Sequence, residues 1–266
     1  MYNKYWGLTE PAFENIADTD FFYNSSQHVQ ALKRLYYAVK TRKAGAMLIG
    51  EIGSGKTLIS RALILNLMPE GKWEFGVITQ PLLGPVESLR EILYQLRIDN
   101  SSKDKTALLH ALHNQLIENH KGGKHTVLIV DEAQAITNME TLDQLRLLTN
   151  FQESKGFLLS LILMGQPELE VRIRNMPALA DRISIKYRLR GLSPSQTEQY
   201  VTHRLSIAGS KDNIFTKEAI NALYQYSKGM PRKLNKLCDL TLVVAFNKGL
   251  KSINQEIVLA VAKDGR

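Results

Sequence analysis

The stretch Gly50-Glu51-Ile52-Gly53-Ser54-Gly55-Lys56-Thr57 decides the fold of this chain. It matches the phosphate-binding pattern Gly-x-x-x-x-Gly-Lys-Ser/Thr at every fixed position. Glycines let the backbone turn tightly and direct its N–H groups at an anion, while Lys56 can reach the terminal phosphates of a nucleotide. The Thr57 hydroxyl is a suitable ligand for Mg²⁺. The predicted nucleotide contacts are Gly50, Glu51, Ile52, Gly53, Ser54, Gly55, Lys56, Thr57 and Leu58.

The residues on either side of this loop support the prediction. Ala46 to Ile49 is a short apolar run typical of a strand, and Leu58 to Met68 has the composition of a helix. A strand, a glycine loop and a helix in this order are the setting that the motif requires, because the helix N-terminus adds its dipole to the phosphate site. An ordinary glycine-rich turn with an incidental lysine is the alternative, and this context disfavours it.

The composition predicts a globular protein without a membrane span. The chain has 266 residues, of which 44% are hydrophobic and 23% are charged, so it can hold one large domain or one medium and one small domain. The longest apolar runs, Phe157 to Met164 and Leu240 to Phe246, are too short to cross a bilayer. The N-terminus lacks the apolar core of a signal peptide. The single cysteine, Cys238, excludes an internal disulfide, so we expect a cytoplasmic protein.

Apolar runs and helical patterns alternate through the first two thirds of the chain. The run from Thr126 to Val130 is continuous in Val, Leu and Ile, which is typical of a strand covered on both faces in a parallel sheet. Alternation of strands with helices favours a doubly wound α/β fold. Further strands are expected at residues 75–79, 158–164 and 182–190.

The character of the sequence changes near residue 191. Helical patterns follow at residues 196–207, 217–226, 232–246 and 254–262, without another strand. We therefore expect an α/β core over residues 1–191 and a small helical lid domain over residues 192–266. The first 30 residues are rich in aromatic side chains without a period, and we expect them to lie as an irregular segment against the α/β core. These aromatic residues are Tyr5, Trp6, Phe13, Phe21, Phe22 and Tyr23.

Asp131 and Glu132 end the apolar run at the place where ATP hydrolysis needs two carboxylates. The first acid can orient Mg²⁺, and the second can polarise the attacking water. Two solvated acids at the end of a strand are the alternative, which the phosphate loop upstream disfavours.

Three further polar residues are weaker candidates. Gln166 follows an apolar strand and could contact the γ-phosphate or the water, although such a residue is more often solvated. Arg232 lies in the first turn of a lid helix after Pro231 and could pair with phosphate, or it could be one of several surface cations. Arg182, or else Arg172 or Arg174, could reach the ATP of a neighbouring subunit as an arginine finger.

The net charge of +8 is concentrated near the C-terminus, where residues 192–266 carry 11 Lys and Arg residues against 6 Asp and Glu residues. This excess suits an anionic partner such as duplex DNA, although net charge supports only non-specific attraction. Lys186, Arg188 and Arg190 alternate with apolar residues and share one face. A solvated sheet edge is the commoner explanation of that pattern.

The complete set of motifs resembles the AAA+ ATPases, and within them the ExeA/GspA-type secretion ATPases with their relatives in pilus biogenesis and transposition modules. The resemblance covers essentially the whole chain. It rests on the phosphate loop and on the motifs Tyr5-Trp6-Gly7-Leu8, Val130-Asp131-Glu132-Ala133-Gln134, Gly165-Gln166-Pro167-Glu168-Leu169, Asp181-Arg182-Ile183 and Gly229-Met230-Pro231-Arg232.

This resemblance implies a role for each matching position. It makes Gly50 to Thr57 the Walker A loop and Asp131 with Glu132 the Walker B pair. It also makes Gln166 the first sensor, Arg232 the second sensor and Arg182 the arginine finger. The glutamine departs from the Asn or Thr usual in AAA+ proteins, although it is normal in this subgroup. The aromatic N-terminal segment is implied to lie near the adenine.

The resemblance further implies ATP and Mg²⁺ as cofactors and a ring or filament of identical subunits. Secretion members of the family continue into a membrane span and a peptidoglycan-binding domain, whereas this sequence ends at residue 266. We therefore expect an ATPase without an integral membrane segment, whose ATP-dependent oligomers control a partner complex. The alternatives are an ATP-dependent DNA-binding regulator of a transposition-type system and an accessory ATPase of a pilus or secretion machine.

Overall fold

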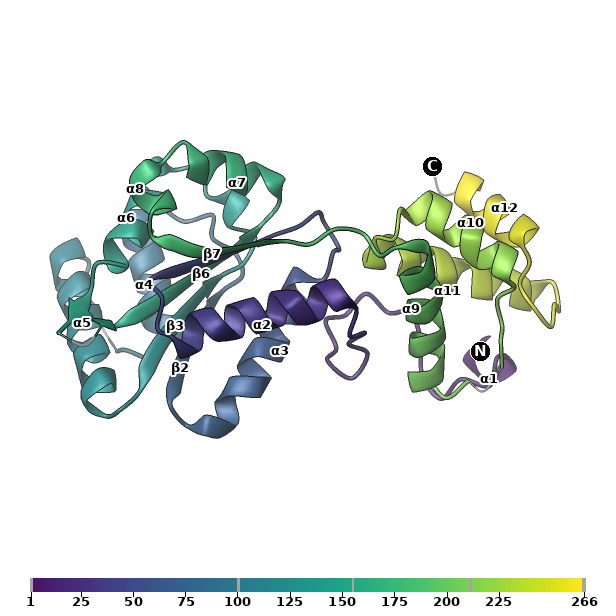
Figure 1. The fold of residues 1–266 in the computed structure, drawn as a ribbon, viewed down its shortest axis with the longest axis horizontal. Coiled ribbons are helices and arrows are strands. Elements are labelled where there is room, and N and C mark those ends of the chain that lie inside the picture. Colours follow the sequence, from purple (N-terminus) through teal and green to yellow (C-terminus); the bar gives the residue numbers. More distant parts are fainter. Residues whose placement is uncertain (1, 100, 155, 211, 265–266) are drawn as a thin grey trace. The chain divides into compact units, whose positions relative to one another are not determined.

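The chain folds into two compact units. The computed structural model describes residues 2–99, 101–154, 156–210 and 212–264, and Figure 1 shows its ribbon. The α/β unit comprises residues 29–51 and 59–189. The helical unit comprises the chain up to residue 28, residues 52–58, and the chain from residue 190 onward.

A five-stranded parallel sheet forms the centre of the α/β unit. Its order is β2-β3-β6-β1-β7, and every neighbouring pair is parallel. All residues of β1, β3 and β6 are buried, and the unbroken apolar sequence of β3 predicted this for that strand. The bounds are β1 Gly45–Ile49, β2 Trp73–Ile78, β3 His125–Val130, β6 Leu159–Gly165 and β7 Ile183–Arg188.

Helices cover both faces of this sheet, which confirms the predicted α/β class. Side chains such as Met47 and Leu128 pack into one cluster with α4 to α8. Leu35 of α2 and Leu63 of α3 are fully buried outside that cluster, so these two helices cover the opposite face. Figure 1 shows α2 and α3 together, separate from α4 to α8. The bounds are α2 Ser26–Lys40, α3 Lys56–Leu67, α4 Pro85–Gln95, α5 Lys105–Lys121, α6 Met139–Leu148, α7 Pro167–Arg174 and α8 Pro177–Ala180.

Shorter elements complete this unit. Two single turns of 3₁₀ helix and one short antiparallel pair of strands lie between the longer elements. The bounds are η1 Met68–Glu70, η2 Ala133–Ala135, β4 Gln152–Glu153 and β5 Gly156–Phe157. None of the four was predicted, because two or three residues are too few to show a period.

The carboxyl ends of the strands share one edge of the sheet, and hydrogen bonds fix where the chain leaves it. The Gly50 N–H donates to the Gly165 carbonyl at 3.0 Å, just past the ends of β1 and β6. The Asp131 N–H donates to the Ile78 carbonyl at 2.8 Å, just past the ends of β3 and β2. The start of the phosphate loop and the acidic pair therefore leave the sheet at the same edge.

The helical unit contains the helices that the sequence predicted after residue 191. Ser193 and Gln196 form a capping box at the start of α9, and Thr216 caps α10. The bounds are α1 Tyr2–Tyr5, α9 Pro194–Ile207, α10 Lys217–Ser227, α11 Pro231–Asn247 and α12 Gln255–Asp264. Cys238 of α11 is fully buried in the core of this unit, and burial raises the pKa of its thiol. Over the described residues, no helix is both long enough and apolar enough to span a bilayer.

The N-terminal aromatic segment is the main departure from expectation. The predicted α/β core of residues 1–191 included this segment, but Trp6, Phe13 and Phe21 are part of the core of the helical unit. The Trp6 indole N–H donates to the Leu242 carbonyl of α11 at 3.2 Å. A segment without a period carries no signal for its partner, so only the tertiary contacts decide where it packs.

Arg204 of α9 holds this segment in place although its side chain is buried. Its guanidinium donates to the Ala12 carbonyl at 2.6 Å, to the Glu14 carbonyl at 3.2 Å and to the Tyr200 hydroxyl at 3.1 Å. The guanidinium also lies over the Phe21 ring, 4.6 Å from its centroid. A buried charge is tolerated only when its donors are satisfied, and here backbone carbonyls of the N-terminal segment satisfy them.

We predict that Arg204→Ala destabilises the helical unit by about 2–4 kcal/mol, because it removes a ring contact and the donor to the buried Ala12 carbonyl. Arg204→Lys should recover only part of this loss, since an ammonium lacks the planar fork. Chemical denaturation measures both effects, with the exposed Arg190→Ala as the matched control. An Arg204→Ala variant as stable as the control would contradict the assignment.

Candidate functional site

The phosphate loop has the local structure that its sequence requires. Strand β1 ends at Ile49 and helix α3 begins at Lys56, so the loop joins a strand to a helix N-terminus. Gly53 has a φ of +75° and Gly55 a φ of +99°, which side-chain-bearing residues rarely adopt. Lys56 is 4% exposed, whereas Ile52 of the same loop is 54% exposed.

Arg232, a predicted site residue, lies directly against the loop. Its backbone N–H donates to the Gly53 carbonyl at 3.3 Å. A Cβ atom added to Gly53 would lie 2.3 Å from the Cβ of Arg232, a distance that no side chain tolerates. The second residue of α11 and the loop therefore pack backbone to backbone, and the exposed guanidinium projects from a fixed base.

His28, which sequence reasoning missed, contacts the loop as closely. Its Nε2 lies 2.9 Å from the Ser54 carbonyl, and its Nδ1 lies 2.6 Å from the Ser25 hydroxyl. Burial lowers the pKa of His28, against the opposing effect of the Ser54 bond, so the ring is neutral at pH 7. A histidine near the start of a helix has no distinctive pattern, so the sequence alone carried no signal for this contact.

The side chains of the loop fit an anionic phosphate group. The Ser54 side chain is fully buried, and within residues 2–99, 101–154, 156–210 and 212–264 its hydroxyl finds no hydrogen-bond partner. Gly53 and Gly55 leave no room on their outer sides, where Arg232 and His28 lie. A buried hydroxyl without a protein partner next to Lys56 suits a bound oxyanion.

The acidic pair lies at the carboxyl end of β3 in the α/β unit. Asp131 is 4% exposed, and its carboxylate accepts the Glu132 N–H at 2.8 Å. Glu132 has a φ of +51° and a ψ of +34°, the left-handed conformation that costs a non-glycine residue about 1–3 kcal/mol.

Gln134 connects this pair to Gln166, the other predicted residue of the α/β unit. The Gln134 amide donates to the Glu132 carboxylate at 2.5 Å, and its carbonyl oxygen accepts the Gln166 backbone N–H at 3.0 Å. The Gln166 amide reaches the same Glu132 oxygen at a longer distance, 3.4 Å. Gln134 is part of the quoted motif Val-Asp-Glu-Ala-Gln, so its position two residues after Glu132 was visible, but its contacts were not.

The arginines of this unit have different partners. Arg172 donates to the carbonyls of Gln134 and Ile136, so it holds the segment that follows Glu132. Arg182 donates to the Asn150 side chain at 2.6 Å and lies just before β7. Because β7 is parallel to β1, Arg182 lies at the amino-terminal edge of the sheet, opposite the edge where the phosphate loop begins.

Residues of the N-terminal segment line a small pocket of the helical unit that also includes the loop. His28, Gly55 and Leu58 meet Phe22 and Tyr200 here. The remaining lining residues are Ile16, Asp18, Phe21, Tyr23, Leu192, Arg204 and Pro231. The lining is largely apolar and aromatic, which is typical of a pocket for a flat ring system.

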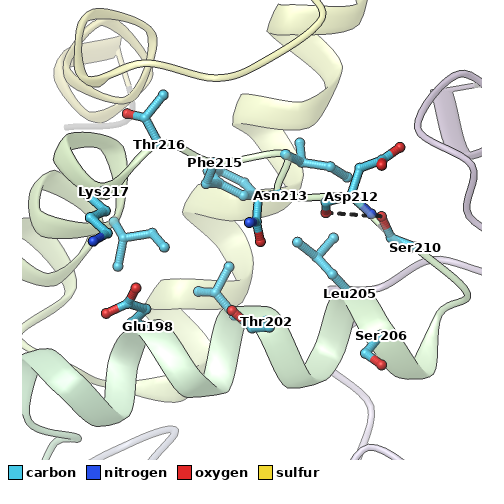
Figure 2. A pocket seen from close by; sticks show the side chains of 13 residues that line it. Glu198, Thr202, Leu205, Ser206, Ser210, Asp212, Asn213, Phe215, Thr216 and Lys217 are labelled. Atoms are coloured by element: carbon cyan, nitrogen blue, oxygen red, sulfur yellow. Dashed lines mark hydrogen bonds between the residues drawn. The ribbon is translucent and has the colours of Figure 1, made fainter.

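A larger pocket of 650 Å³ lies elsewhere in the helical unit. Figure 2 shows its side chains, among them Glu198 and Thr202 from α9 and Phe215 and Lys217 from the opposite side. None of its lining residues belongs to the phosphate loop or to the acidic pair. Size alone therefore does not identify the functional pocket of this chain.

We predict that Gln134→Ala lowers the rate of ATP turnover at saturating ATP by about 10- to 100-fold. The variant loses a hydrogen bond to the charged Glu132 carboxylate, which is worth about 1.5–3 kcal/mol. Gln166→Ala should cost less, because its bond to Glu132 is longer. The exposed Gln152→Ala is the matched control. A larger loss for Gln166→Ala than for Gln134→Ala would show that Gln134 is not the connecting residue.

Comparisons with known proteins show which proteins this chain is similar to. The General secretion pathway protein A of Aeromonas hydrophila is 37% identical over 265 residues, which is 98% of this chain and 48% of that protein. The chain thus spans about half the length of this curated relative. Two solved structures share the fold, each with 17% identity over 94% of this chain. The Cdc6p of Pyrobaculum aerophilum has a TM-score of 0.73, and this chain covers 71% of it. The Drosophila ORC bound to DNA has a TM-score of 0.72, and this chain covers 63% of the matched chain.

A family model described as AAA domain matches residues 39–173, half of the chain. The matched residues include the phosphate loop, the acidic pair and Gln166. The chain belongs to the AAA ATPase family.

Proposed function

We propose that this ATPase forms ATP-dependent oligomers of identical subunits, and that the oligomers control a partner complex. The observation that carries the proposal is the position of Arg182. It lies at the amino-terminal edge of the sheet, away from the edge where the chain's own phosphate loop begins. An arginine finger at that edge suits the ATP of a neighbouring subunit, so a complete site needs two copies of the chain.

ATP is the proposed substrate, and the loop residues Gly50 to Leu58 hold its phosphates. Lys56 and the N–H groups of the loop compensate the phosphate charge. Thr57 and Asp131 would hold Mg²⁺, which supplies further neutralisation of the phosphate oxygens when bound. Both residues have the oxygen donors that Mg²⁺ prefers. Glycines with positive φ and the buried Ser54 hydroxyl support this assignment.

Glu132 is the proposed residue that polarises the attacking water. Its carboxylate already accepts hydrogen bonds from Gln134 and Gln166, which hold it in one orientation. Gln166 then acts as the first sensor, through Glu132 and the water. Arg232, fixed against Gly53, acts as the second sensor and contacts phosphate with its guanidinium.

The adenine is proposed to enter the small pocket beside His28 and Gly55. Its volume is 40 Å³, well below the roughly 300 Å³ of ordinary ligand pockets, so side chains of the N-terminal segment must move when a base enters. Ile16, which is 67% exposed, has room to do so. This assignment would link base binding to the segment that Arg204 holds.

A mixing experiment tests the shared site. Lys56→Ala removes the phosphate-binding lysine, and Arg182→Ala removes the proposed finger, so each variant alone should have little ATPase activity. Random mixing in equal amounts should restore about a quarter of the wild-type rate, because a Lys56→Ala subunit still offers Arg182 to an intact loop. The exposed Arg97→Ala should retain full activity alone. No recovery on mixing would overturn the role of Arg182 in a neighbour's site.

The identity of the partner complex rests on similarity alone. The relative from Aeromonas hydrophila is named for the general secretion pathway, which favours an accessory ATPase of a secretion or pilus machine. We place the ATPase in the cytoplasm, where ATP is supplied and a lone buried thiol such as Cys238 stays reduced. Co-purification from cells expressing a tagged chain identifies the partner.

A DNA-binding assembly factor is a second candidate, because two of the predicted cations are exposed on an edge strand. Lys186 and Arg188 point to the same side of β7, and Arg188 also lies 3.8 Å from Glu170. Strand β7 is at the edge of the sheet, so it is open to a partner on one side. Duplex DNA would meet these cations through its phosphates.

This candidate predicts ATP-dependent binding to duplex DNA that weakens steeply with salt. Lys186→Ala should reduce the slope of log affinity against log salt by about one, because one phosphate contact is lost. Lys33→Ala, an exposed cation on α2, should leave the slope unchanged. Fluorescence anisotropy of a labelled duplex measures both. Equal slopes for the wild type and Lys186→Ala would exclude a phosphate contact by Lys186.

A further inference from the structure

We propose that His28 is a positioning residue for the phosphate loop: it fixes the orientation of the Ser54–Gly55 peptide so that the Gly55 N–H faces the bound phosphate. This inference rests on the proposed binding of ATP by residues 50–58. It assigns a role to a side chain outside the loop, at a distance of 22 or more positions in the sequence.

The hydrogen bond determines which way one peptide group faces. His28 Nε2 lies 2.9 Å from the Ser54 carbonyl oxygen, so Nε2 carries the proton and donates it. In a trans peptide, the carbonyl and the N–H of the next residue point in opposite directions. With the Ser54 carbonyl held towards His28, the Gly55 N–H must point away from His28.

The peptide needs this restraint because of the glycine that follows. Gly55 has a φ of +99° and lacks a Cβ, so rotation of the Ser54–Gly55 peptide meets little steric resistance. A flipped peptide would present a carbonyl oxygen to the phosphate in place of an N–H, and the two groups would repel. The Gly53 carbonyl is held in a similar way by the Arg232 N–H, at 3.3 Å.

The protonation state of His28 is set by Ser25. The Ser25 hydroxyl lies 2.6 Å from Nδ1, and it also accepts the His28 backbone N–H at 3.4 Å as the cap of α2. Because Nε2 donates to Ser54, Nδ1 must accept the hydroxyl proton of Ser25. The ring is therefore neutral with its proton on Nε2. Burial, which lowers the pKa of His28, favours the same state.

Steric contacts leave the ring no alternative position. His28 is 5% exposed, and the Phe22 ring meets it edge to face at 6.1 Å between centroids. A Cβ added to Gly55 would lie 2.8 Å from Nε2, so the ring packs directly on the loop backbone. The His28 ring thus acts as a rigid support for the Ser54–Gly55 peptide, and residues 22–28 carry it.

Calorimetric titration of the full chain with ADP tests the inference without requiring hydrolysis. His28→Phe keeps a flat ring but removes the donor to the Ser54 carbonyl. Without that restraint the Gly55 N–H loses its hydrogen bond to the charged phosphate, so ADP affinity should fall by about tenfold to a hundredfold. His28→Gln retains an N–H donor and should recover most of the affinity. The exposed His110→Phe is the matched control.

A second measurement separates positioning from general destabilisation. Thermal unfolding without nucleotide should give nearly the same midpoint for His28→Phe and His28→Gln, while their ADP affinities differ. Nitrogen NMR of the wild-type imidazole should show the proton on Nε2. Equal ADP affinity for His28→Phe and the wild type, or a proton on Nδ1, would overturn the proposal. So would failure of the wild type to bind ADP.

Two results separate the role of His28 from the ATP-driven oligomer. If the wild type binds ADP but hydrolyses no ATP under any assembling condition, the ATP-driven oligomer is wrong and the role of His28 still stands or falls by the titration. If mixing of Lys56→Ala and Arg182→Ala restores activity while His28→Phe binds ADP normally, the inference about His28 alone is wrong.

Discussion

The buried guanidinium of Arg204 is the constraint on which the helical unit depends. A charge this deep must have its donors satisfied, and here two backbone carbonyls, of Ala12 and Glu14, satisfy them. The path of the N-terminal segment is therefore set by electrostatics as well as by its aromatic side chains. The same segment continues through Phe21 and Phe22 to His28, which touches the phosphate loop. The geometry of the phosphate loop therefore depends on how the N-terminal segment packs.

The parts of the fold that sequence predicted are those with local signals. The loop of residues 50–57 has a fixed pattern, and the unbroken apolar run of β3 identifies a buried parallel strand. The lid helices have caps and clear periods. The N-terminal segment was placed with the wrong unit because its partners lie about 190 residues away, and nothing in residues 5–23 encodes them.

The residues of the candidate site also differ in whether they carry a local sequence signal. Lys56, Asp131 and Glu132 are recognisable because their chemistry requires those residue types at those spacings. Gln134 and His28 are different, since each acts through another residue: Gln134 holds Glu132, and His28 holds a backbone carbonyl. A supporting role of this kind depends on contacts across the fold, and many residue types can fill it. Arg172 is a similar case, because its charge suggested a finger while its donors serve two carbonyls of its own chain.

Cys238 gives the chain a built-in reporter of local opening. It is the single cysteine, it is fully buried in the core of the helical unit, and its raised pKa keeps the thiol protonated. A thiol reagent can modify it only after this core opens, so the labelling rate follows the opening of the helical unit while the cysteine-free α/β unit stays silent. Nucleotides that contact the N-terminal segment would slow the labelling. The labelling rate of Cys238 therefore measures how far ligand binding stabilises the helical unit against opening.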